Sequence, residues 1–377
     1  MRAPVLPGQD LIRPLALAPL RQRLPWIGGD LQTLRDTVRP VRLPPDLGRA
    51  LPLPLPGGEQ LLGVLDAPTG GGDGAALVVL LHGLGGSSDR EGLRRLALAL
   101  QDADLAVLRL NLRGAGAGRP LAAGTYAAEC NADLLPVLAQ LRTVAAGRPL
   151  FGVGLSLGGT ILLNALLVAS GPPLLDGLVC LSSPLDLAAC SARIAQPRNR
   201  VYARWLLKRL VAQTLEDPFG IPAAERLALT LAGGPSSIRV FDQRITAPRW
   251  GYGSVEQYYA EASPLAALLD PERRSVLPPT LLVHAEDDPW VPVAALHRVA
   301  QALADSPSGK ATAVKATAVK ATAVDVLAGD AAAPRILISR HGGHNGFHGR
   351  GDSPRACWGD RLTVRWLLQL LASGRLT

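Results

Sequence analysis

Short, wholly apolar runs that alternate with longer helical stretches constrain the fold of this 377-residue chain more than any other feature. The first run, LVVLLH, begins at Leu77, and similar runs begin at Leu105, Pro149 and Leu175. Continuous apolar strands separated by helices are typical of a parallel sheet that is covered on both faces. We therefore predict an α/β fold with a mostly parallel sheet and helices on both of its faces.

This alternation stops after Pro184 and resumes only at the run TLLVHA, which begins at Thr280. The intervening residues have helical periodicity and no clear strand, so we expect a helical cap insertion at about 187–262. The strand RILIS and a terminal amphipathic helix then complete the pattern. The chain is accordingly expected to form one α/β domain at 51–377, interrupted by the cap.

Two segments fall outside this pattern. Residues 1–50 are rich in Pro and Arg with weak periodicity, and we interpret them as an N-terminal arm, with regular structure beginning near Leu51. The second segment is the repeat KATAV, which occurs in three copies at 310–324. A period of five residues matches neither a helix nor a strand, so an expanded surface loop is favoured over an interaction tract.

The formal net charge of +8 raises the question of a nucleic-acid partner. Only four of the 39 basic residues are Lys, the Arg residues are spread along the chain, and aromatic residues make up 4%. We therefore expect no nucleic-acid partner, because neither a clustered basic face nor a stacking platform is indicated. For the cap stretch Tyr202–Val211, weak peripheral contact with anionic lipid competes with a solvated helix face, which we favour. The basic residues around this stretch are Arg198, Arg200, Arg204 and Arg209.

The cysteines and the apolar segments bear on location. Cys130, Cys180, Cys190 and Cys357 form no CxxC pair and no close metal-ligand spacing. A chain of this size does not need disulfides to hold its core, so a reducing, cytoplasmic location is expected. No apolar run approaches the roughly 18 residues of a membrane-spanning helix, and the first residues lack a signal-peptide pattern.

The strongest chemical motif is Gly154-Leu-Ser-Leu-Gly158, which lies between an apolar strand and a helix. This pattern is typical of a nucleophile elbow, in which a sharp turn raises the hydroxyl of Ser156 above the sheet edge. Glycine is needed on both sides because side chains there would collide with neighbouring backbone. A dinucleotide-binding loop is the weaker interpretation, because the spacing is GxGxxxG and the loop comes late in the sheet.

A serine nucleophile needs a base to take its proton and an acid to orient that base. In a strand–turn–helix site of this type the acid follows the serine along the chain. Asp287 and Asp288 come directly after the run TLLVHA, where a strand end would place them at the carboxyl edge of the sheet. We favour Asp288 as the acid and interpret Asp287 as a turn or capping residue.

The base is expected after the acid, and His341, His344 and His348 all follow the strand RILIS. We favour His344, because its GGHNGF loop is able to bring an imidazole over the sheet edge. An oxyanion also needs backbone N–H donors. We assign them to Leu157, the residue after the serine, and to Leu84 in the glycine-rich HGLGG loop. His82 of that loop is interpreted as a bracing residue.

The order of the motifs LLHGLGG, NLRGAGAG, GVGLSLGG, SSPLDLAAC, HAEDDPWVP and GGHNGF resembles the YheT-like branch of the α/β-hydrolases. That branch comprises serine esterases related to the animal abhydrolase proteins that act on lipid esters. The stretches 237–248 and 256–263, and the tripeptide Leu31-Gln-Thr33, are similar to characteristic segments of the branch. The resemblance implies the α/β-hydrolase fold, with a catalytic triad and oxyanion donors at Ser156, Asp288, His344, Leu84 and Leu157.

Together these features predict a serine hydrolase that cleaves carboxylic esters, either short-chain acyl or lipid esters, through an acyl-enzyme. Its partner is expected to be a small-molecule acyl ester, and no metal or organic cofactor is expected. A thioesterase or amidase with the same triad is an alternative. A non-catalytic binding protein is disfavoured, because the serine, acid and histidine are all present in order. Oligomeric state is left open.

Overall fold

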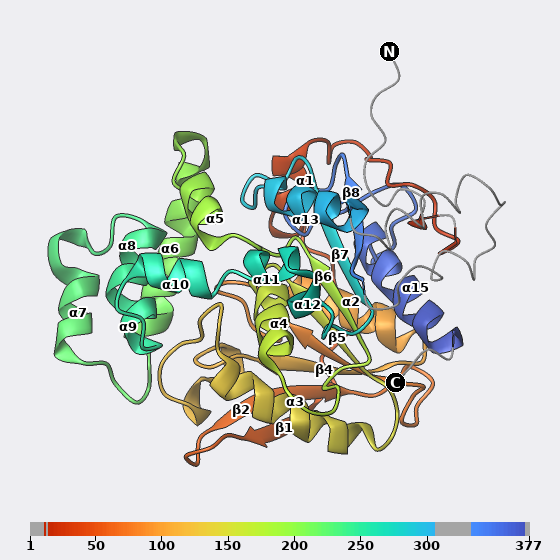
Figure 1. Cartoon of the computed structure of the whole chain (residues 1–377), viewed down its shortest axis with the longest axis horizontal. Helices are drawn as coiled ribbons and strands as arrows, with labels where there is room; N and C mark the ends of the chain where they lie inside the picture. The colour runs from red at the N-terminus through yellow and green to blue at the C-terminus, as the bar shows by residue number, and fades with distance from the viewer. Residues whose placement is uncertain (1–10, 13, 306–332, 374–377) are drawn as a thin grey trace.

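An eight-stranded sheet forms the centre of the computed structural model, which describes residues 11–12, 14–305 and 333–373 (Figure 1). The strands are β1 (Arg49–Pro54), β2 (Gln60–Asp66), β3 (Leu77–Leu81), β4 (Ala106–Asn111), β5 (Leu150–Leu155), β6 (Gly177–Leu181), β7 (Thr280–Ala285) and β8 (Arg335–Ser339). Their order across the sheet is β1-β2-β4-β3-β5-β6-β7-β8. All pairs from β4 to β8 are parallel, and the predicted α/β class with a mostly parallel sheet is confirmed.

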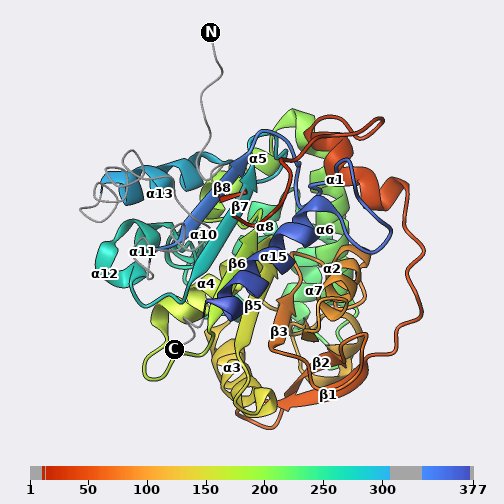
Figure 2. The same ribbon diagram turned by 90° about the vertical axis from the view of Figure 1, so that its right-hand side faces the viewer.

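Helices cover both faces of this sheet (Figures 1 and 2). They are α2 (Glu91–Gln101), α3 (Asn131–Ala145), α4 (Leu157–Val168), α11 (Leu265–Leu269), α12 (Pro271–Arg274), α13 (Ala294–Asp305) and α15 (Trp358–Ala372). On one face, Leu138 of α3, Ile161 of α4 and Val299 of α13 belong to one buried core. On the other face, Leu96 of α2 and Trp366 of α15 belong to a second core. Strands β3, β4, β6 and β7 are buried along their whole length, which explains their continuous apolar sequences.

An antiparallel extension at one edge of the sheet was not foreseen from the sequence. Strand β1 pairs with β2, and β2 pairs with β4, both in antiparallel fashion. Most residues of β1 are exposed, and the strand carries Pro52 and Pro54. Proline is tolerated in an edge strand because one side of that strand makes no ladder bonds. The strand therefore lacks the kind of apolar run that identified the central strands, such as β3 and β4.

Between β6 and β7 the chain leaves the sheet and forms a group of helices beside it (Figure 1). These helices are α5 (Leu187–Ile194), α6 (Arg200–Leu215), α7 (Ala223–Thr230), α8 (Ile238–Phe241), α9 (Ala247–Arg249) and α10 (Val255–Glu261), with a π-helical turn at Asp242–Thr246. A small core of their own holds them together, made of Leu206, Leu210, Leu229, Ile238, Phe241 and Ile245. We refer to these helices as the cap.

The N-terminal segment differs from its expected form. Helix α1 (Gly29–Val38) lies within the predicted arm, so the expectation that regular structure begins near Leu51 is wrong. The buried side chains of this helix are Gln32 and Arg35, which are polar. A helix that packs through polar side chains has no apolar stripe, and periodicity of apolar residues therefore does not reveal it. The division of the chain at residue 50 stays a prediction, and the KATAV repeat at 310–324 lies outside the described residues.

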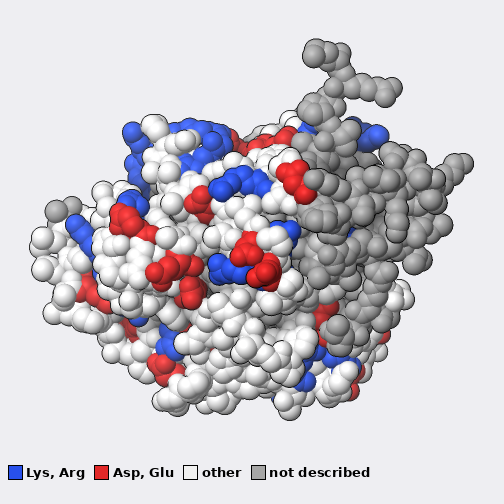
Figure 3. All heavy atoms as spheres, viewed as in Figure 1, with Lys and Arg blue, Asp and Glu red and all other residues white. Residues whose placement is uncertain are grey.

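Basic side chains gather over one end of the cap, near α5 and the start of α6 (Figure 3). Arg198, Arg200 and Arg204 are exposed there, next to the exposed apolar side chains of Val201 and Trp205. A solvated helix face stays the favoured prediction for this surface, with contact to anionic lipid as the alternative. None of the helices in the described ranges is long and apolar enough to cross a membrane.

Candidate active site

Ser156 lies at the sharp joint between β5 and α4, with a backbone φ of 53°. A φ in this left-handed region is strained for a residue with a side chain. The flanking glycines allow the close packing that holds it. A Cβ at Gly154 would lie 2.2 Å from the amide nitrogen of Gly159, and one at Gly158 would lie 2.5 Å from the carbonyl oxygen of Leu81. The turn therefore requires both glycines of the predicted elbow.

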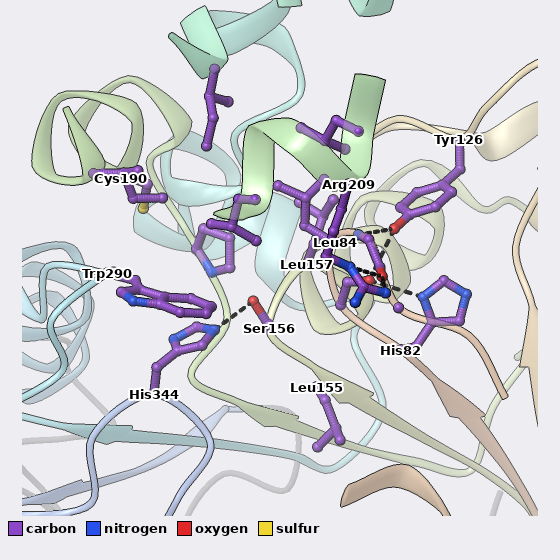
Figure 4. Close-up of a pocket in the computed structure, with 18 of the residues that line it drawn as sticks. His82, Leu84, Tyr126, Leu155, Ser156, Leu157, Cys190, Arg209, Trp290 and His344 are labelled. Carbon is purple, nitrogen blue, oxygen red and sulfur yellow. Dashed lines mark hydrogen bonds between the residues drawn. The ribbon is translucent and has the colours of Figure 1, made fainter. Parts of the chain in front are cut away.

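A continuous line of hydrogen bonds runs from this serine to the predicted acid (Figure 4 shows its first bond). His344 Nε2 lies 2.8 Å from Ser156 Oγ, and His344 Nδ1 lies 2.9 Å from Asp288 Oδ2. Both the imidazole and the carboxylate are buried. The structure thus brings together the three side chains that the sequence singled out, in the order nucleophile, base and acid.

The environment of Asp288 favours its charged form. Its Oδ1 accepts hydrogen bonds from the amides of Trp290 and Val291, at 2.8 and 3.0 Å. Burial acts to raise the pKa of Asp288, but the neighbouring imidazoles of His344 and His284 and the Val291 amide lower it, and the net pKa lies below the ordinary value. An ionised Asp288 is suited to hold a proton on His344 Nδ1 and so direct Nε2 toward the serine.

The other predicted candidates occupy positions away from Ser156. Asp287 Oδ1 accepts a hydrogen bond of 2.8 Å from the amide of Gly343, and its Oδ2 lies 3.3 Å from His341 Nδ1. Asp287 therefore anchors the backbone of the histidine loop. His348 is buried beside Asp36, with 3.1 Å between its Nε2 and the carboxylate Oδ1. Neither His341 nor His348 contacts the serine.

The two predicted oxyanion donors lie at one side of Ser156 (Figure 4). Leu157 is the first residue of α4, and Leu84 lies in the loop after β3. Across the described residues, neither of these amides donates a hydrogen bond to another protein group. The first amides of a helix have no partner within the helix and carry the positive end of its dipole. The arrangement suits a developing negative charge next to the serine.

The side chains of Tyr126, His82 and Arg209 all form hydrogen bonds with backbone of the loop that contains Leu84. Tyr126 Oη accepts a hydrogen bond from the Gly85 amide at 2.7 Å and donates one to the Gly83 carbonyl at 3.0 Å. His82 Nδ1 donates to the same Gly83 carbonyl at 2.9 Å, while its Nε2 accepts from the Leu112 amide at 3.3 Å. Burial lowers the pKa of His82 to about 4, so its ring is neutral and braces the loop.

The third side chain, Arg209, comes from cap helix α6. Its Nε and Nη2 both donate to the Gly85 carbonyl, at 3.1 and 2.6 Å, and its guanidinium lies 5.0 Å from the ring centroid of Trp205. Arg209 is thus a direct link between the cap and the loop that carries the Leu84 amide. Sequence reasoning missed Tyr126 and assigned Arg209 to the basic surface of the cap, because no local pattern relates either residue to a loop so distant in the chain.

Helix α1 holds the opposite side of the site, the histidine loop. Thr33 Oγ1 accepts a hydrogen bond of 2.8 Å from the amide of His344. The buried side chain of Gln32 donates to the His348 carbonyl at 2.8 Å and accepts from the His348 amide at 2.7 Å. Gln32 and Thr33 belong to the tripeptide that the sequence marked without a role. Their contacts show that the N-terminal segment forms part of the site.

A cavity of about 630 Å³ lies between Ser156 and the cap. Its wall is largely apolar, with side chains such as Leu187, Leu206 and Ile238. Trp290 packs over the His344 ring with 4.6 Å between the ring centroids (Figure 4). In the part of the chain that the structure describes, no group of three His, Cys, Asp or Glu side chains is placed to hold a metal ion.

The contact between Thr33 and His344 gives a first prediction. Thr33→Val removes the acceptor for the His344 amide at nearly constant volume, so the histidine loop loses one anchor. We expect labelling of Ser156 by a fluorophosphonate probe to slow about tenfold, since small displacements of a reacting group are costly. Thr33→Ser keeps the hydroxyl and should label at close to the wild-type rate. Equal labelling rates for the Val and Ser variants would contradict this role.

Arg209 gives a second prediction. In Arg209→Ala the Gly85 carbonyl loses two donors, and the loop with the Leu84 amide loosens. We expect kcat for p-nitrophenyl butyrate to fall about tenfold, less than the loss of an oxyanion donor itself, with KM little changed. Arg209→Lys should retain part of the rate. Arg204→Ala, an exposed change on the same helix, is the control, and an unchanged kcat in Arg209→Ala would exclude the coupling.

Comparison with known proteins agrees with this geometry. The profile of a family described as alpha/beta hydrolase fold matches residues 76–314. The chain is 31% identical over 215 residues to the YheT protein of Escherichia coli (strain K12), which is named as a candidate esterase, and 28% identical over 216 residues to phospholipase ABHD3 of Mus musculus. Each match covers 57% of this chain, but only 62% of the first protein and 51% of the second.

Among solved structures, the 2,6-dihydroxy-pseudo-oxynicotine hydrolase shares the fold, with a TM-score of 0.50 at 16% identity. That match covers 92% of this chain and 73% of the other. The same fold is indicated by the sheet order, by the serine turn after β5 and by the profile match over more than half of the sequence. The chain belongs to the α/β-hydrolase fold family, and within that family it is YheT-like.

Proposed function

We propose that this hydrolase cleaves carboxylic esters through an acyl-enzyme formed on Ser156. The observation that carries the proposal is the hydrogen-bonded series Asp288, His344, Ser156 at the floor of a cavity. The free amides of Leu84 and Leu157 beside the serine support it, because acyl transfer develops negative charge on a carbonyl oxygen. The esterase and phospholipase names of the relatives are consistent with the same chemistry.

In the first half-reaction, Ser156 Oγ attacks the ester carbonyl carbon while His344 Nε2 takes the hydroxyl proton. A bond forms between Oγ and the carbonyl carbon, and the carbonyl oxygen becomes an oxyanion that accepts from the Leu84 and Leu157 amides. Asp288 stabilises the imidazolium during this step. His344 then gives its proton to the alcohol oxygen as the bond between that oxygen and the carbonyl carbon breaks, which leaves the acyl-enzyme.

In the second half-reaction, water replaces the serine hydroxyl as the nucleophile, and Ser156 Oγ becomes the leaving group. His344 Nε2 takes a proton from a water molecule whose oxygen bonds to the acyl carbon. When the tetrahedral species collapses, the bond to Ser156 Oγ breaks and His344 returns the proton to that oxygen. The acid product then leaves. The same histidine thus acts as base and acid in each half, which its position between Ser156 and Asp288 allows.

The cavity supports esters with an apolar part, either short-chain acyl or lipid esters. Its volume of about 630 Å³ and its Leu and Ile lining suit an aliphatic chain. The relative named as a phospholipase is consistent with a lipid ester.

The cytoplasmic location expected from cysteine usage stays a prediction. The four cysteines are buried and form no disulfides in the structure.

The nucleophile is tested with Ser156→Ala. We expect this variant to lose labelling by a fluorophosphonate and to hydrolyse p-nitrophenyl acyl esters at least about 10³-fold more slowly, because no other side chain supplies the attacking oxygen. Thermal unfolding close to that of the wild type would exclude misfolding as the cause. Labelling of the Ala variant at the wild-type rate would overturn the assignment.

Rates on matched oxyester, thioester and anilide substrates should be highest for the oxyester.

The two neighbouring aspartates offer a matched pair. Asp288→Asn removes the charge that holds the proton on His344 Nδ1, and its amide favours the unproductive tautomer. We expect kcat to fall about 10³- to 10⁴-fold. Asp287→Asn keeps an acceptor for the Gly343 amide and should stay within about tenfold of wild type. The opposite order of the two losses, measured under identical conditions, would move the acid role to Asp287.

A further inference from the structure

A second polar group faces the cavity, on the cap and away from the proposed reacting atoms. Asp242 begins the π-helical turn Asp242–Thr246 and lines the same cavity as Ser156. Its Oδ2 accepts a hydrogen bond of 2.7 Å from the hydroxyl of Tyr259, and its Oδ1 accepts one of 2.8 Å from the hydroxyl of Thr246. Both of these donors also line the cavity.

The Asp242 carboxylate has no counter-ion of its own. Among the described residues, no Lys, Arg or His forms an ion pair with it, and its partners are the hydroxyls of Tyr259 and Thr246. Arg239 lies over the ring of Tyr259, but it pairs with Glu256. A buried carboxylate without a counter-ion is unfavourable unless another group compensates its charge. The two hydroxyls bond to different oxygens of the carboxylate, so they satisfy one acceptor position on each oxygen but do not neutralise its charge.

The protonation state and the free acceptor positions of the Asp242 carboxyl are those of a group that can bind a hydrogen-bond donor. Burial raises the pKa of Asp242 to about 6, although the hydrogen bonds from Tyr259 and Thr246 act to lower it. At neutral pH the group is therefore mostly anionic. A carboxylate has about four acceptor positions, of which the two hydroxyls use two. The remaining acceptor capacity is open to the cavity, while Leu206, Ile238 and Phe241 nearby are apolar.

We propose that Asp242, Tyr259 and Thr246 form a recognition subsite for a hydrogen-bond-donating group, a hydroxyl or an ammonium, carried by the ester substrate. An apolar cavity with one convergent polar cluster is the usual plan of a specific ligand site. A donor on the substrate satisfies the free acceptor positions, and a cationic donor also compensates the charge. Anionic groups are disfavoured at this end of the cavity, because they would face the carboxylate.

This subsite rests on the proposed ester hydrolysis, and it deepens it by naming a feature of the substrate. The cap thereby has two separate roles. Arg209 contacts the oxyanion loop, whereas Asp242 contacts the distal part of the substrate. A hydroxyl or ammonium that reaches Asp242 would place the ester bond relative to Ser156, so that the polar group contributes to orientation as well as to binding.

The test compares p-nitrophenyl alkanoates with their ω-hydroxy and ω-amino analogues, from four to ten carbons. A parallel series of butyrate esters varies the alcohol in the same way. We expect at least one hydroxy or amino ester to exceed its alkyl counterpart about tenfold in kcat/KM. In Asp242→Asn the ratio of amino to alkyl kcat/KM should fall to about twofold or less. Glu261→Gln, an exposed change on α10, is the control.

The wild-type enzyme provides an independent readout if Asp242→Asn folds poorly. The ratio of amino to alkyl kcat/KM should fall as the pH drops through about 6, because Asp242 gains its proton there. Any pH effect on the chemical step that the two esters share changes both rates alike and cancels in the ratio. The groups that face Asp242 are the phenols of Tyr258 and Tyr259, whose raised pKa values keep them neutral in this range.

Several outcomes overturn the subsite. They are a lack of preference for any hydroxy or amino ester in both series, a preference that survives unchanged in Asp242→Asn, or a ratio that does not depend on pH. If the proposed function itself is wrong, the result is different: no ester of either series is hydrolysed in a way that depends on Ser156. Calorimetric binding of the same esters to Ser156→Ala measures the preference without turnover and separates the two cases.

Discussion

The turn at Ser156 is the constraint on which the rest of the site depends. Its φ of 53° places a non-glycine residue in a strained region, at a cost of about 1–3 kcal/mol. The turn persists because Gly154 and Gly158 let β5, α4 and the end of β3 approach without side chains between them. The result is a hydroxyl at the carboxyl edge of the sheet, where the loops after the parallel strands β3, β7 and β8 also begin. Every other functional group is arranged around that hydroxyl.

Two segments that are not part of the sheet hold the two sides of the serine. Helix α1 contacts the histidine loop through Gln32 and Thr33, and cap helix α6 contacts the oxyanion loop through Arg209. In both cases the side chain bonds to backbone atoms of the loop. Such contacts set where His344 and the Leu84 amide lie, although the supporting residues touch no reacting atom. The N-terminal segment and the cap therefore both help to position groups of the candidate active site.

Much of the fold could be predicted because buried parallel strands need continuous apolar runs. The elbow motif and the order of its partners also predicted which side chains the fold brings together at Ser156, Asp288 and His344. Elements without an apolar signature were missed. Helix α1 is buried through polar side chains, and β1 is an exposed edge strand. The proposed subsite at Asp242 was not predicted, although the resemblance covers the stretches 237–248 and 256–263 that contain its residues, since an aspartate in a helical stretch resembles any solvated position.

The sequence by itself determined the class of fold, the serine turn and the chain order of the acid and base, because steric limits and strand burial leave local patterns. Only the tertiary structure decided which of two adjacent aspartates faces His344, and it did so through the direction of each carboxylate. It also decided that Tyr126, Arg209 and Thr33 converge on the site from distant parts of the chain. Hydrogen bonds between such distant segments have no local pattern, because they depend on how the whole chain packs.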